Sequence, residues 1–76
     1  MKKRSVTLRG HATSVTVEDE FWTILKRIAK LQNQSIASLI DDIDEKRLET
    51  TEGGLSSAIR IHVLNWVISQ TDQTTL

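Results

Sequence analysis

The chain has no cysteine and no proline, and its 76 residues include only three aromatic side chains, Phe21, Trp22 and Trp66. Without cysteine, neither a disulfide nor a thiolate-ligated zinc ion can stabilise the fold. The length allows one domain, and a domain of this size is marginally stable alone. Oligomerisation is the common support that remains for so small a chain. The lack of cysteine also fits a reducing cytosol.

No long apolar run is present either, so we expect no membrane span, no export signal and a cytoplasmic location. The formal net charge is zero and gives no argument for nucleic acid. The charges are unevenly distributed, however. Before Glu18 the chain carries basic residues and no acid, whereas the acids concentrate between Asp41 and Glu52. This asymmetry predicts a basic patch at one end of a neutral molecule or, alternatively, a frayed basic terminus.

Residue types that carry catalysis or bind metals are sparse. The two histidines, His11 and His62, are far apart and have no cysteine or carboxylate at ligand spacing beside them. No serine lies in a nucleophile-elbow or phosphate-loop pattern. The acids at 41–45 are interpreted as the solvated face of a helix. We therefore expect no enzyme activity, no metal, no cofactor and no small-molecule substrate.

Two alternating runs predict half-buried strands within a strand region at 5–17, after a flexible basic arm at 1–4. Val6 and Leu8 are apolar at even positions, whereas Val15 and Val17 are apolar at odd positions. One flat strand cannot present both sets to the same face. Gly10 is the candidate for the change of phase, as a bulge or as a turn. The pattern leaves open whether the runs form a bent ribbon or a hairpin.

Apolar residues at three-and-four spacing predict helices over 18–32, 36–48 and 56–69, followed by a disordered tail at 70–76. Asn33 can adopt a left-handed C-cap, and Ser35 and Ser56 are candidate N-caps. The third helix carries a second apolar stripe. Its residues are Ile61, Leu64 and Ile68. A helix that is apolar on two sides requires cover on both, which indicates a partner chain.

The strand at 13–17 runs into the first helix without a turn, so its partner lies earlier in the chain or in a second copy. If Val15 and Val17 face the core, then Ala12, Ser14 and Thr16 face outward. A two-stranded ribbon fits the major groove of DNA, where serine, threonine and alanine side chains can contact base edges. Alternatively, these three residues are only the solvent-exposed face of a half-buried strand.

Phosphate contacts are predicted at two further places. The free N–H groups around Ser35 and Ile36, at the start of the second helix, can hold a phosphate. Arg4, Arg9 and the lysines of the arm can add contacts to the DNA backbone that raise affinity without selecting a sequence.

The order strand, helix, short turn and capped helix resembles the ribbon-helix-helix family of bacterial DNA-binding proteins. The stretches that carry this likeness are Thr13–Val17, Phe21–Leu31 and Gln34–Ile40. Further stretches are similar to a subgroup of small, mostly uncharacterised bacterial ribbon-helix-helix domain proteins. They are Arg4–Val6, Arg9–His11, Glu18–Trp22 and Leu55–Arg60.

The resemblance implies an α+β ribbon-helix-helix fold with an additional C-terminal helix. It also implies an intertwined homodimer with an intermolecular antiparallel ribbon, and transcriptional repression or antitoxin-like regulation through double-stranded DNA. The alternative is a dimeric protein–protein interaction module with the same fold. The chain departs from the pattern in its small uncharged ribbon residues and in a preceding segment that allows Ser5, Thr7 and Arg9 to be the exposed face. A third departure, the extra helix, could build tetramers or bind a protein.

Overall fold

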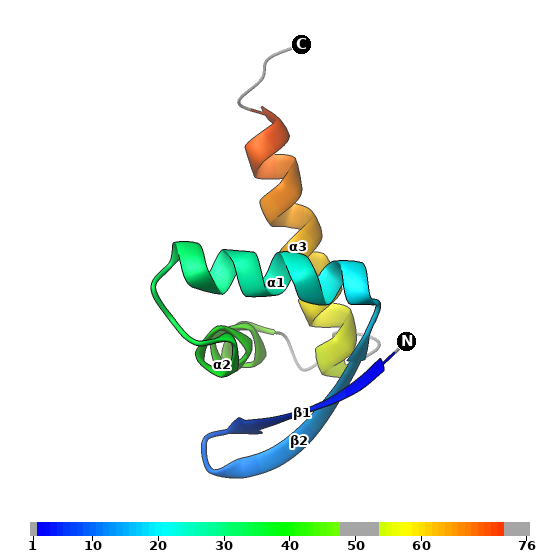
Figure 1. Cartoon of the computed structure of the whole chain (residues 1–76), viewed down its shortest axis with the longest axis vertical. Helices are drawn as coiled ribbons and strands as arrows, with labels where there is room; N and C mark the ends of the chain where they lie inside the picture. The colour runs from blue at the N-terminus through cyan, green and yellow to red at the C-terminus, as the bar shows by residue number, and fades with distance from the viewer. Residues whose placement is uncertain (1, 48–53, 73–76) are drawn as a thin grey trace.

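The computed structural model describes residues 2–47 and 54–72 and contains a β-hairpin followed by three helices (Figure 1). The elements are β1 (Lys2–Leu8), β2 (His11–Val17), α1 (Asp19–Leu31), α2 (Ile36–Lys46) and α3 (Gly54–Asp72). The hairpin lies below the helices in this view, and α3 extends away from it. The architecture is α+β, as predicted. No helix among the described residues is long and apolar enough to cross a membrane.

The two strands pair antiparallel through a two-residue turn, so the segment forms a hairpin and not one bent strand. Leu8 pairs with His11, and the register runs to Lys2 opposite Val17. Arg9 and Gly10, between them, have φ values of 52° and 80°. Positive φ at both central residues is the mark of a type I′ turn, whose twist matches that of the strands it joins.

This turn explains the odd–even mismatch of the two apolar runs. Residues directly opposite each other in an antiparallel pair point to the same face of the sheet. Each pair in this register joins an even position to an odd one, so Val6 and Leu8 share a face with Val15 and Val17. All four side chains are buried.

In the N-terminal region one expectation needs correction and one open alternative is decided. Lys2, Lys3 and Arg4, predicted as a flexible arm, belong to β1. On the edge that β1 occupies, the partner of β2 is a strand of the same chain and not a second copy. An intermolecular ribbon of the kind that the resemblance implies would have to use the opposite edge of β2.

The turn between α1 and α2 follows from local sequence signals. Asn33 takes the predicted left-handed conformation, with a φ of 56°. The N–H of Gln34 donates to the carbonyl of Ala29, and the N–H of Asn33 donates to that of Lys30. This pair of bonds is the Schellman motif that ends many helices. Ser35 then caps α2 as predicted, because its hydroxyl accepts a hydrogen bond from the N–H of Ser38 at 3.0 Å.

The third helix differs from its prediction at both ends. It begins at Gly54, before the predicted N-cap Ser56, and it continues to Asp72. Residues 70–72 of the predicted disordered tail are therefore helical, and 73–76 lie outside the described residues. The hydroxyl of Ser56 is used elsewhere, since it accepts the backbone N–H of Thr16 in β2.

The core lies between the inner face of the hairpin and the three helices. Its fully buried large side chains come from every element except β1. They are Val15, Val17, Leu25, Ile28, Ile40 and Ile59. Leu31 continues the apolar spacing of α1 but is 66% exposed, because it is the last residue of the helix.

We expect the substitution Gly10→Ala to destabilise the protein by about 1–2 kcal/mol, the cost of placing a Cβ in the left-handed region. Apart from the adjacent residues, nothing lies within 4 Å of where that Cβ would be, so the effect is conformational and not a clash. Urea denaturation followed by circular dichroism measures it. An unchanged midpoint would contradict the type I′ turn.

Candidate nucleic-acid interface

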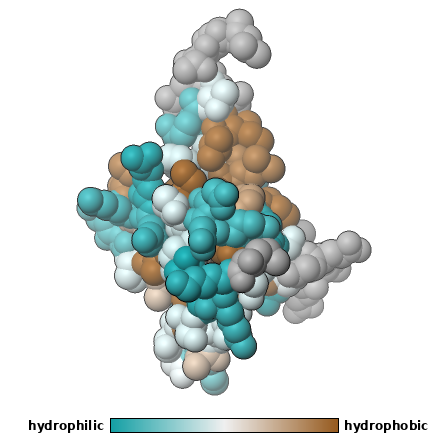
Figure 2. All heavy atoms as spheres, turned by 45° about the vertical axis from the view of Figure 1, so that its right-hand side comes forward, coloured by the Kyte–Doolittle hydropathy of each residue, from teal (hydrophilic) through white to brown (hydrophobic). Residues whose placement is uncertain are grey.

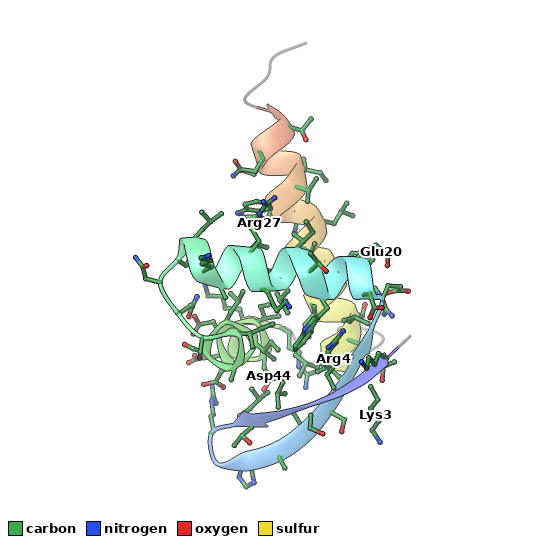
Figure 3. The ribbon with its side chains drawn as sticks, in the orientation of Figure 1. Lys3, Arg4, Glu20, Arg27 and Asp44 are labelled. Carbon is green, nitrogen blue, oxygen red and sulfur yellow. The ribbon has the colours of Figure 1, made fainter. Side chains whose placement is uncertain are left out.

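The hairpin presents one polar face to solvent, on the side opposite the helices. We define the outward hairpin face by the side chains that alternate with the buried ones. They are Lys3, Ser5, Thr7, Ala12, Ser14 and Thr16. All are exposed except Thr16, which is half-buried. In Figure 3 the labelled Lys3 points away from the helices, whereas Arg4, the next residue, points toward them.

This face combines hydroxyls and small methyl groups with a single charge, that of Lys3. It carries no acid that would repel a phosphate. The lower end of the molecule, where the hairpin lies, is correspondingly pale in Figure 2, between the hydrophilic and hydrophobic extremes. Serine and threonine hydroxyls can donate to or accept from any base edge, and the methyl groups of alanine and threonine can contact a thymine methyl.

The two sets of outward residues that the sequence offered as alternatives lie side by side. Ser14 is directly opposite Ser5, and Ala12 is directly opposite Thr7. Lys3, opposite Thr16, joins them. It was predicted as a DNA-backbone contact on a flexible arm and not as part of this face. The signal that could have placed it here is the odd–even mismatch, which a two-residue turn at Arg9–Gly10 produces.

Arg4, predicted as a phosphate contact, points into the molecule. Its guanidinium lies 4.5 Å from the ring centroid of Trp22, and Nη2 donates to Oδ1 of Asp19 at 3.1 Å. A cation over an indole ring and a carboxylate beside it hold the side chain against α1. Arg4 therefore attaches the hairpin to the first helix.

Arg9 has a similar role at the other end of the hairpin. Its Nε donates to Oδ1 of Asp41 at 3.0 Å, and Nη2 lies 3.4 Å from Oε2 of Glu45. Both carboxylates belong to the acidic face of α2. The pairs are partly exposed, so each is worth little alone. Together they place the turn against α2 and neutralise two acids of that helix.

The predicted phosphate site at Ser35 and Ile36 has the geometry of a capped helix start. Ser35 satisfies the N–H of Ser38, and no acceptor is recorded in the described residues for the N–H groups of Ile36 and Ala37. The first turn of α2 contains no acid. A helix N-terminus of this kind favours an anion through its free donors and its dipole.

The outer edge of β2 is closed near its end by α3. The N–H of Thr16 donates to Oγ of Ser56 at 3.1 Å, and its carbonyl lies 3.4 Å from Nη2 of Arg60. Nε of Arg60 also donates to Oε1 of Glu18 at 2.9 Å. That hydrogen bond lowers the pKa of Glu18. A second strand cannot pair with Thr16 on this edge unless these contacts are broken.

A hollow of about 370 Å³ lies between α2 and α3, with His62 on one wall and Lys46 on the other. His62 is half-buried, and burial, helped by the charge of Lys46, lowers its pKa. The described residues contain no group of three or more side chains able to hold a metal ion.

A family model described as a ribbon-helix-helix domain matches residues 1–67. No curated protein matches the sequence, and no solved structure matches the fold.

We expect Ser56→Ala to destabilise the protein by about 1–2 kcal/mol, because it leaves the part-buried N–H of Thr16 without its acceptor. The matched control is Ser57→Ala, at the next position of α3, which should change stability by less than about 0.5 kcal/mol. Denaturant titration of both variants provides the comparison. Equal losses in the two variants would contradict the proposed closure of the β2 edge.

Proposed function

The chain belongs to the ribbon-helix-helix domain family, and from this premise we propose that it is a dimeric DNA-binding transcriptional regulator, a repressor or antitoxin-like protein of the cytoplasm. The main support for this proposal is the outward hairpin face. Within one chain it supplies the two-stranded polar ribbon that the major groove of B-DNA accommodates.

In the proposed complex, the central pairs of the outward hairpin face meet the base edges. Ser5 and Ser14 offer adjacent hydroxyls, and Thr7 and Ala12 offer methyl groups next to one hydroxyl. Their short side chains bring the backbone of the ribbon close to the floor of the groove. Because the face has no arginine, asparagine or glutamine, sequence preference rests on single hydrogen bonds and methyl contacts, and is modest.

Affinity in this proposal comes mainly from phosphate contacts. Lys2 and Lys3 lie at the open end of the hairpin, and both are exposed. They keep the role that the sequence gave to the arm lysines, whereas the charges of Arg4 and Arg9 are directed at carboxylates of the same chain. The start of α2 at Ile36 adds neutral N–H donors for a second phosphate.

We expect binding to random duplex DNA to weaken steeply as salt is added, since each neutralised phosphate releases counterions. Lys3→Ala should lower the slope of log K against log salt by about 1. Arg27→Ala is the matched control, because Arg27 lies on the side of α1 away from the hairpin (Figure 3) and its loss should leave the slope unchanged. Fluorescence anisotropy at four or more salt concentrations measures the slopes.

No binding of the unmodified protein even at low salt would overturn DNA binding and favour the interaction module. Equal slopes for Lys3→Ala and the unmodified protein would instead show that the outward hairpin face does not meet the backbone.

Ser14→Ala should weaken discrimination at one base position by about 1 kcal/mol while leaving the salt slope unchanged. Ser69→Ala, at an exposed serine of α3, is the control and should alter neither quantity. Selection from a randomised duplex library, followed by sequencing, compares the preferences. An identical preference for Ser14→Ala and the unmodified protein would count against base contacts by this residue.

A further inference from the structure

The hollow between α2 and α3 has an apolar floor and a polar rim. Its volume of about 370 Å³ falls in the lower part of the range of small-molecule sites, roughly 300–1,000 Å³. The apolar floor is made by Leu39 and Ile43 of α2 and Ala58 of α3, whose exposed fractions are 2%, 5% and 8%. All three side chains belong to the core. The hollow is therefore an indentation that reaches the core.

Two cationic side chains and a histidine stand at the rim. Lys46 and Arg47 are at the end of α2, and His62 lies on the wall that α3 forms. Nε of Arg47 donates to Oδ1 of Asp44 at 2.6 Å. For Lys46 and His62, no ion pair or hydrogen bond is recorded within residues 2–47 and 54–72. Both side chains can therefore bond to a ligand without giving up a partner in that part of the chain.

The charge of Lys46 acts on His62 across the hollow. Together with burial, it lowers the pKa of His62, so the imidazole is neutral at pH 7. A neutral imidazole has one N–H donor and one acceptor nitrogen. An anion placed between the two side chains can accept a hydrogen bond from each and offset the charge of the ammonium group. The rim thus offers an anion two donors on opposite walls.

One carboxylate, that of Asp42, also lines the hollow and restricts the charge of the ligand. Asp42 and Lys46 are four residues apart and so lie on the same side of α2. A ligand with several negative charges would be repelled by Asp42, whereas a single carboxylate can bind at Lys46. A cationic ligand at Asp42 would meet the charges of Lys46 and Arg47 nearby. The rim therefore fits one negative charge best.

We propose that this hollow binds a small monocarboxylate that carries an apolar chain. The carboxylate accepts from Nζ of Lys46 and from an imidazole N–H of His62, and the chain lies on the apolar floor. Ile61, which also lines the hollow and is 50% exposed, covers one side of the chain. The ligand is bound and not transformed. The site does not depend on the proposed DNA binding.

Octanoate is the probe, used below its micelle-forming concentration, and NMR of the two histidine side chains is the measurement. Octanoate should raise the pKa of His62, because a bound carboxylate stabilises the imidazolium. It should leave the pKa of His11 unchanged, since His11 lies in the hairpin and outside the hollow. Binding should accordingly strengthen as the pH falls from about 8 to about 6. The other titratable groups that line the hollow, Asp42, Lys46 and Arg47, all belong to α2 or its end.

The length of the chain tests the apolar floor. Each buried CH₂ group strengthens binding by about threefold to fourfold, so octanoate should bind about tenfold more tightly than hexanoate. Octylamine, which has the same chain and the opposite charge, should bind more weakly than octanoate.

Lys46→Gln tests the rim, since Lys46 is exposed and its replacement spares the core. This variant should bind octanoate about fivefold more weakly, and Asp42→Asn should bind it more tightly. Lys26→Gln is the matched control, because Lys26 is an exposed lysine of α1 that does not line the hollow, and it should bind octanoate as the unmodified protein does.

An unchanged pKa of His62 in the presence of octanoate would overturn the proposal. Equal affinity of Lys46→Gln and the unmodified protein would also overturn it, since it would indicate adsorption to apolar surface. Tighter binding of octylamine than of octanoate would assign the rim to a cation at Asp42. His62 signals that respond to protein concentration and not to octanoate would assign the hollow to a second copy of the chain. Either of these last two results would equally refute the site.

Discussion

The two-residue turn at Arg9–Gly10 is the constraint on which the rest of the structure depends. It pairs even positions of β1 with odd positions of β2, and so brings two apolar runs that are out of phase in the sequence onto one face. A turn longer or shorter by one residue would send Val6 and Leu8 into solvent. The same register gathers Ser5, Thr7, Ser14 and Thr16 on the opposite face, where the candidate interface lies.

The two arginines of the hairpin hold it against the helices. Arg4 packs on Trp22 of α1, and Arg9 reaches carboxylates of α2. At the outer edge of β2, Ser56 and Arg60 of α3 provide the acceptor and the donor that bond to the backbone of Thr16. One chain thereby builds and anchors a complete ribbon.

Local signals predicted most of the helical structure. Apolar spacing located all three helices, and Asn33 and Ser35 marked the turn between α1 and α2, because these signals act over a few residues. The sequence analysis left undecided whether the two runs form a hairpin or a bent ribbon, although the odd–even mismatch is enough to derive the hairpin. The contacts of Ser56 with Thr16 and of Arg60 with Glu18 join residues about 40 positions apart, and no local pattern encodes them. The inward direction of Arg4 was missed for the same reason, since it depends on where α1 places Trp22. Alternation alone placed Ala12, Ser14 and Thr16 on the outward hairpin face. Placing Lys3 there required the pairing register of β1 and β2.

The central claim is that the ribbon forms within one chain, and NMR on a mixture of isotope-labelled and unlabelled protein tests it most directly. Ser5 and Ser14 are directly opposite, at a position where the bonds between β1 and β2 place the Cα atoms close together. A strong contact between their α-protons should appear in the fully labelled sample. It should vanish in the experiment filtered for contacts between different chains. The appearance of this contact in the filtered experiment would show that the strands pair across two copies and would contradict the account.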